Sequence, residues 1–221
     1  MRLLLISLFL FTSLFSMGLP SEYYKIKDTK QMKKYFFNYI KEISNKQNDL
    51  ILEERKYVTE HYNNPDTKFN KIKKRYKIKD KAPLKTYLKH IDIVPTSIVL
   101  AQASVESGWG KSRFVKQANN IFGQWTWTGK GLVPKNRDAG KKHKIRIFNS
   151  MEQSVRGYLI NLNLGHAYKD FRTTRANLRQ NNQQLKGRKL TSTLINYSQL
   201  REKYVKILDN MIRREKLERF D

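Results

Sequence analysis

The sequence predicts a mainly α (α+β) fold, in which helices surround a small antiparallel β-hairpin lobe and an N-terminal helical extension comes first. Apolar residues recur at spacings of three and four across residues 29–60, which is typical of a long amphipathic helix. Aromatic and polar residues instead alternate across residues 121–128 and again across 144–148, which is typical of paired strands. Helical spacing resumes at Ser150, so the predicted ribbon lies between two helical regions.

The first 18 residues have the pattern of a secretory signal peptide. Arg2 precedes an uncharged apolar run that ends at Phe15, and the small residues Ser16 and Gly18 have the spacing of a cleavage site. The run is shorter than the roughly 20 apolar residues that a membrane-spanning helix needs, although an uncleaved segment would tether the protein. We therefore expect an exported protein of the periplasm or cell envelope.

The rest of the chain divides into a helical extension, residues 19–92, and a second domain, residues 93–216. In the extension, the turn-forming run Asn63–Asp66 ends the first long helix. A shorter basic helix is expected from about residue 69 to 76, and Pro83 opens another that continues to Ile91. We interpret these helices as a scaffold with a solvated basic face.

The charge balance points to a polyanionic partner. Among 221 residues, 45 Lys and Arg stand against 19 Asp and Glu, for a net charge of +26. Export argues against nucleic acid, so we expect an anionic cell wall or membrane surface instead. The absence of cysteine excludes disulfides and zinc–thiolate sites. The four histidines are scattered without an HExxH pair, so we expect no metal and no cofactor.

The second domain opens with a helix that is too apolar for a surface. It starts at Pro95 or Thr96 and ends at the run Gly108–Gly110. Its single carboxylate, Glu106, stands near the C-terminal end, where burial and the negative end of the helix dipole both raise the pKa. A carboxyl group with a raised pKa suits a general acid. The alternative is a structural carboxylate paired with a nearby Lys or Arg.

The ribbon that follows supplies two further kinds of candidate. A short helix over residues 111–118 precedes it, and Gly129–Gly131 forms a turn within it. Trp125 and Trp127 would either stack on sugar rings or pack within the ribbon. Asp138 is the only acid in the long segment from Gly129 to His143.

Three strings carry a resemblance to a known family: Ile98–Ser112 (IVLAQASVESGWGKS), Ala118–Gln124 (ANNIFGQ) and Phe148–Ser154 (FNSMEQS). They resemble the peptidoglycan N-acetylglucosaminidases of glycoside hydrolase family 73. Asp92–Pro95 and Gly131–Pro134 are similar to the Bax branch of that family. The resemblance covers residues 30–216 and implies a lysozyme-like fold for residues 93–216, with a helical lobe, a small β-lobe and a saccharide groove between them.

The resemblance also implies roles for individual residues. Glu106 matches the catalytic general acid, and Tyr197 is the candidate for the family's tyrosine near the reacting sugar, the alternative being a core aromatic. Asp138 is the candidate for the second carboxylate, unless the 2-acetamido group of the sugar takes that part. The expected substrate-binding residues are Gln102, Trp109, Asn120, Phe122, Gly123 and Trp125.

The expected function is that of a monomeric hydrolase that cleaves the β-1,4 bond between N-acetylglucosamine and N-acetylmuramic acid in peptidoglycan glycan strands. A muramidase or lytic transglycosylase is an alternative, because those enzymes also use a lone Glu followed by Ser on a buried helix. A non-catalytic basic protein that binds the cell wall is the second alternative.

Overall fold

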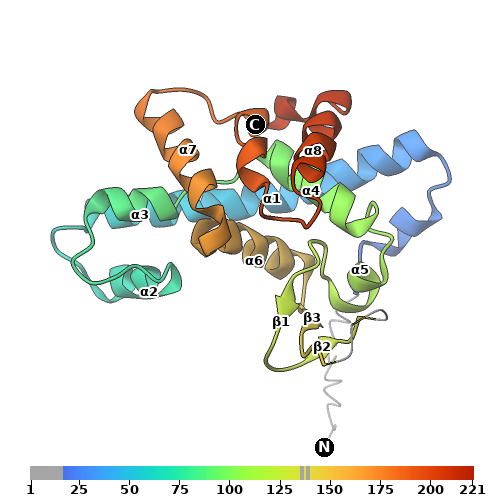
Figure 1. Cartoon of the computed structure of the whole chain (residues 1–221), viewed down its shortest axis with the longest axis horizontal. Coiled ribbons are helices and arrows are strands. Elements are labelled where there is room, and N and C mark those ends of the chain that lie inside the picture. Colours follow the sequence, from blue (N-terminus) through green and yellow to red (C-terminus); the bar gives the residue numbers. More distant parts are fainter. Residues whose placement is uncertain (1–16, 135–136, 138–139) are drawn as a thin grey trace, which may run out of the picture.

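The computed structural model describes residues 17–134, 137 and 140–221, and it confirms a mainly α fold with a small antiparallel sheet (Figure 1). The α-helices are α1 (Thr29–Glu60), α2 (Thr67–Arg75), α3 (Leu84–His90), α4 (Thr96–Ser107), α5 (Arg113–Ala118), α6 (Met151–Leu164), α7 (Lys169–Gln180) and α8 (Glu202–Arg214). Short 3-10 helices span Ser21–Lys25, His166–Tyr168, Gly187–Lys189, Thr191–Leu194 and Leu217–Phe220. Residues 1–16 of the expected signal lie outside the described residues.

Helix α1 is the long amphipathic helix that the sequence predicts over residues 29–60. The Asp28 carboxylate caps its N-terminus by accepting a hydrogen bond of 2.7 Å from the Gln31 amide. Its apolar face packs across α4 and α6, as Figure 1 shows. Within the described residues, neither α1 nor any other helix is long and apolar enough to cross a membrane.

Helix α4 lies at the centre of the molecule and contacts α1, α8 and the segment Leu217–Phe220. At its N-terminus, the Asp221 carboxylate accepts hydrogen bonds of 2.8 Å from both the amide and the hydroxyl of Ser97. At its C-terminus, Gly108 adopts a left-handed conformation with φ of 54°, which ends the helix. Distant parts of the chain therefore hold α4 in place.

The β-lobe is a three-stranded sheet in the order β1-β3-β2, formed by Trp125–Thr126, Lys144–Arg146 and Gly131–Leu132. Both outer strands pair antiparallel with β3, and Ile145 faces Trp125 on one side and Leu132 on the other. The antiparallel ribbon is confirmed, but β1 is shorter than the alternation over residues 121–128 predicts. The preceding residues form a turn instead, because the Asn120 side chain takes up the backbone groups of Gln124.

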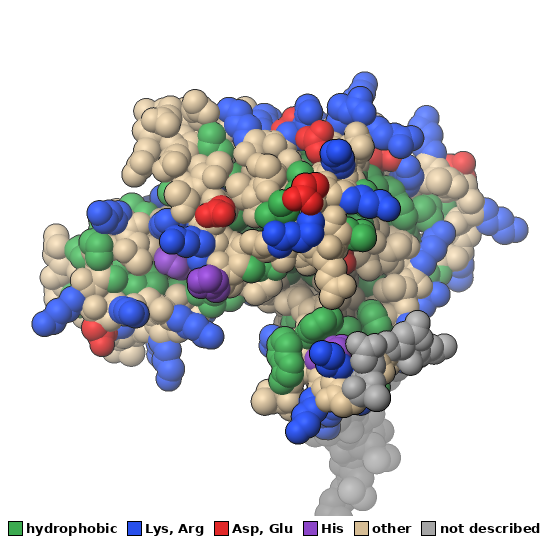
Figure 2. Space-filling model, viewed as in Figure 1, with side chains coloured by type: hydrophobic (Ala, Val, Ile, Leu, Met, Phe, Trp, Pro, Cys, Tyr) green, Lys and Arg blue, Asp and Glu red, His purple; other side chains and the backbone are tan. Residues whose placement is uncertain are grey.

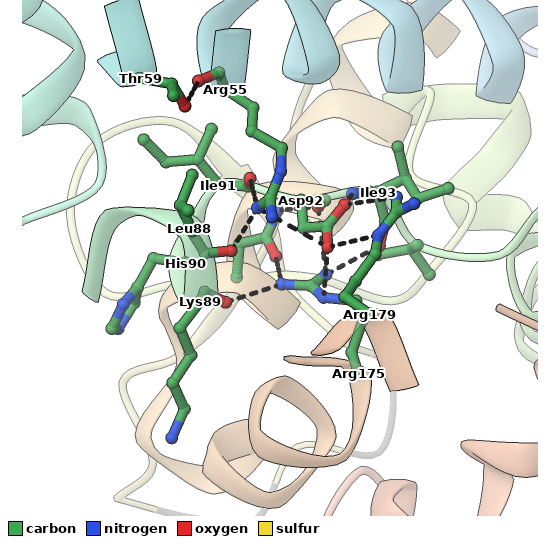
Figure 3. Close-up of polar contacts among 12 residues, drawn as sticks. Arg55, Thr59, Leu88, Lys89, His90, Ile91, Asp92, Ile93, Arg175 and Arg179 are labelled. Atoms are coloured by element: carbon green, nitrogen blue, oxygen red, sulfur yellow. Dashed lines mark hydrogen bonds and ion pairs between the residues drawn. The ribbon is translucent and has the colours of Figure 1, made fainter. Parts of the chain in front are cut away.

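A buried ion cluster joins α1 to α7 (Figure 3). The Asp92 carboxylate is almost fully buried and lies 2.9 Å from Arg179, 3.7 Å from Arg55 and 3.9 Å from Arg175. Burial alone would raise the pKa of Asp92, but the three guanidinium groups hold it below its usual value. Because Arg55 belongs to α1 and the other two to α7, the cluster joins helices from both regions.

Candidate active site

Glu106 lies in the last turn of α4 and is half-buried. Its Oε1 accepts a hydrogen bond of 2.6 Å from the phenol of Tyr204, which α8 presents. No Lys or Arg in the described part of the chain forms an ion pair with Glu106, and none is among the causes of its pKa shift. The alternative of a structural carboxylate clamped by a cation therefore has no support in the described residues.

The electrostatic setting of Glu106 favours the protonated carboxyl group. Burial raises its pKa above the usual value, and the hydrogen bond from Tyr204 opposes that shift only in part. The raised pKa extends the pH range over which Glu106 carries a proton. This is the state that a general acid needs before it acts.

A chain of buried polar groups orients the Tyr204 hydroxyl toward Glu106. The Gln102 amide nitrogen donates a hydrogen bond of 2.9 Å to the Tyr204 oxygen, and the Gln102 amide oxygen accepts one from Tyr158. Gln102 is fully buried one helical turn before Glu106. It therefore lies beneath the site, where it positions the partner of Glu106.

Tyr197 lies beside this chain, in the turn before α8. Its ring stacks parallel to that of Tyr204, with 5.6 Å between ring centroids, and its hydroxyl donates to the Phe122 carbonyl at 3.3 Å. Burial raises its pKa well above the usual value, so the phenol stays neutral. The structure thus places Tyr197 next to Tyr204 and in contact with the segment that leads to the β-lobe.

The segment from Asn120 to Gly123 connects the helical lobe to the sheet. The buried Asn120 amide donates hydrogen bonds of 2.8 Å to the carbonyls of Gln124 and Arg146, and so fastens both strand ends. Phe122 is buried and stacks on Tyr158 at 3.9 Å. Gly123 has φ of +65°, and nothing lies within 4 Å of the position that a Cβ would occupy. The chain is therefore open to solvent at Gly123.

Of the remaining candidates, Trp125 and Trp109 lie on different elements. Trp125 is 52% exposed on β1 and stacks on His143 at 4.2 Å. Trp109 is half-buried against α1, where its ring meets Phe36 and Phe37 edge-on. Asp138 lies outside the described residues.

A groove of about 540 Å³ borders the open segment. It runs beneath α6, and Figure 2 shows that this face is hollowed between the arm of α2 and α3 and the β-lobe. Its lining consists of Lys77, Gln124, Trp125, Trp127, Arg146, Gly157, Ile160, Asn161, Leu164, Gly165 and His166. Glu106, Tyr197 and Tyr204 are not among these lining residues. Phe122, two residues before Gln124 in the chain, accepts the hydrogen bond from Tyr197.

Sequence reasoning missed Tyr204 as the direct partner of Glu106. The signal that could have found it is the spacing of Tyr204, Leu208 and Ile212, which lie four residues apart and are all buried on α8. This spacing turns Tyr204 inward, toward α4.

The comparison with known families agrees with this geometry. Residues 81–217 match a glucosaminidase family model described as mannosyl-glycoprotein endo-beta-N-acetylglucosaminidase. The chain belongs to the glucosaminidase family. The match confirms the family resemblance found in the sequence.

One curated relative of this glucosaminidase is Protein bax of Escherichia coli (strain K12), which is 38% identical over 132 residues. The aligned segment covers 58% of this chain and 47% of the relative, so it spans about half of that protein. No solved structure matches the chain. Among the described residues, no group of three or more His, Asp and Glu lies close enough together to hold a metal ion.

Proposed function

We propose that this glucosaminidase is an exported peptidoglycan hydrolase that cleaves the β-1,4 bond between N-acetylglucosamine and N-acetylmuramic acid. The observation that carries the proposal is the setting of Glu106 at the end of a buried helix, with a raised pKa and a tyrosine as its hydrogen-bond donor. None of the described cations forms an ion pair with it. The expected export signal and the net charge of +26 support an anionic wall as the target.

In the proposed reaction, the Glu106 carboxyl group protonates the glycosidic oxygen as the bond to N-acetylglucosamine breaks. The departing strand leaves with a free hydroxyl, and positive charge develops on the sugar ring. Either a water molecule activated by a second carboxylate attacks the anomeric carbon, or the 2-acetamido oxygen of the same sugar attacks it first and water then opens the resulting oxazoline. Both routes give a reducing N-acetylglucosamine end. Asp138 is the candidate for the second carboxylate.

Product analysis on purified sacculi tests the proposal, with wild type and Glu106→Gln compared side by side. We expect wild type to release fragments that end in reducing N-acetylglucosamine, and Glu106→Gln to release none. Fragments that end in reducing N-acetylmuramic acid would indicate a muramidase instead. Anhydro ends would indicate a lytic transglycosylase, and equal clearing of a zymogram by both proteins would rule out Glu106 as the general acid.

A further inference from the structure

One residue that lines the groove beneath α6, Lys77, lies outside the segment that matches the family model. Lys77 follows α2 and lies four residues before that segment begins at residue 81. The other lining residues belong to α6, the turn after it and the β-lobe (Figure 1). The N-terminal extension therefore contributes a side chain of its own to the groove.

The described lining is cationic and carries no carboxylate. Lys77, Arg146 and His166 are its ionisable side chains. Within the described part of the chain, neither Lys77 nor Arg146 forms an ion pair. Ion pairs do engage other arginines, namely Arg55, Arg75, Arg156, Arg175, Arg179 and Arg188. A concave surface with unbalanced positive charge attracts an anionic group.

The backbone at Lys77 favours a residue without a side chain. Lys77 has φ of +49°, a left-handed conformation in which glycine is the usual residue at the end of a helix. Its amide donates to the Lys74 carbonyl and the Ile78 amide donates to the Lys73 carbonyl, both at 3.1 Å, which completes the helix end. A glycine would satisfy the same backbone bonds with less strain, so the lysine side chain can be removed there without loss of the helix end.

Exposed aromatic rings lie in the same groove. Trp127 is 69% exposed, and it meets Trp125 edge-on with 6.1 Å between ring centroids. Aromatic faces stack on the apolar faces of sugar rings, whereas ammonium and guanidinium groups bind carboxylates. The groove thus combines features that suit a glycan strand with an acidic substituent.

We propose that this groove binds a carboxylate carried by the glycan strand, and that Lys77 and Arg146 are the residues that bind it. The inference rests on the proposed function and names the substrate feature that the groove selects. Peptidoglycan offers two such carboxylates, those of the peptide stem and the lactyl carboxylate that is exposed when the stem is removed. Both are absent from an unsubstituted N-acetylglucosamine polymer.

The test compares cleavage rates at limiting substrate for wild type, Lys77→Gly and Arg146→Gln. One substrate is intact sacculi, and the other is sacculi whose carboxylates have been amidated with excess methylamine. On intact sacculi, each variant should lose about fivefold, the upper range for a solvent-exposed ion pair. On amidated sacculi, the difference between wild type and each variant should disappear, because the carboxylate that both cations bind is no longer charged. Glycan strands stripped of peptide by an amidase tell which carboxylate is bound, since the lactyl group of intact sacculi is tied up in an amide bond. The difference between wild type and variants disappears on stripped strands if the stem carboxylates are bound, and it is found only there if the lactyl group is bound.

Lys77→Gly also separates binding from folding, because relief of the left-handed strain should keep its thermal midpoint at or above that of wild type. Lys77→Arg should restore the rate. The charge-matched controls are Lys79→Gln and Arg213→Gln, which remove exposed cations outside the groove and should leave cleavage unchanged. An equal loss for the variants on intact and amidated sacculi would overturn the inference, as would wild-type cleavage that amidation leaves unchanged. Failure of wild type to cleave any of these substrates would instead refute the proposed function.

Discussion

Replacement of Tyr204 by Phe tests whether the tyrosine sets the protonation of Glu106. The change removes the 2.6 Å hydrogen bond that Tyr204 donates to the Glu106 carboxylate. That bond stabilises the charged form of Glu106 and lowers its pKa, so its loss leaves the effect of burial unopposed. A hydrogen bond to a charged group contributes about 1.5–3 kcal/mol, so its loss should raise the pKa of Glu106 further.

The pH dependence of kcat/KM on sacculi measures this shift. Because the general acid must be protonated, activity falls as the pH rises through the pKa of Glu106. In Tyr204→Phe, this alkaline limb should move to higher pH, with a lower maximal rate because the carboxyl group is less well oriented. An alkaline limb that stays in place or moves downward would refute the role assigned to Tyr204.

Tyr197→Phe is the matched control for that experiment. It removes a hydroxyl that donates a hydrogen bond to the Phe122 carbonyl. The Tyr197 ring stacks on Tyr204, but its hydroxyl makes no hydrogen bond with Glu106. Its alkaline limb should coincide with that of wild type.

Tyr204→Phe also leaves the buried Gln102 amide nitrogen without its acceptor, which should lower the free energy of unfolding by about 1–3 kcal/mol.

Three further predictions concern stability. Glu106→Gln should unfold at the same temperature as wild type near pH 4 and at a higher temperature near pH 8. The reason is that a carboxyl group with a raised folded-state pKa destabilises the folded protein once it ionises. A lower melting temperature of the variant at pH 8 would contradict this. Asp92→Ala leaves Arg55, Arg175 and Arg179 without their shared anion and should cost about 3–5 kcal/mol in urea unfolding, whereas a cost below about 1 kcal/mol would show that the cluster does not hold the extension. Asp221→Ala removes the cap of α4 and should cost about 1–2 kcal/mol in the same assay, and an unchanged midpoint would show that the cap is dispensable.

The elements with a regular pattern were predictable, and those that depend on long-range contacts were not. The bounds of α1 follow from its apolar spacing and from the turn residues after it, and α4 ends at Gly108 as expected. The alternating pattern before β1 misled, because the Asn120 side chain binds the Gln124 amide and Gly123 adopts a left-handed conformation, so the chain bends before the strand begins. A pattern along the chain does not show which distant segment supplies a hydrogen-bond partner.

The same limit applies to the site. Glu106 could be found because it is a lone acid in an apolar helix, and burial raises its pKa as expected. Its partner could not be found in this way, since Tyr204 and Tyr197 occur close together in the sequence and only the packing of α8 on α4 decides which one reaches the carboxylate. Trp109 likewise stands near Glu106 in sequence, but its ring packs on α1.

Both ends of α4 depend on contacts with residues 202–221, the last of the described chain. Tyr204, which contacts Glu106, and Asp221, which caps the opposite end of α4, are both translated after the whole helical and β-lobe framework. A nascent or proteolytically shortened chain that lacks residues 202–221 has Glu106 without its donor and α4 without its cap. The arrangement proposed for the general acid therefore requires residues 202–221 to be in place.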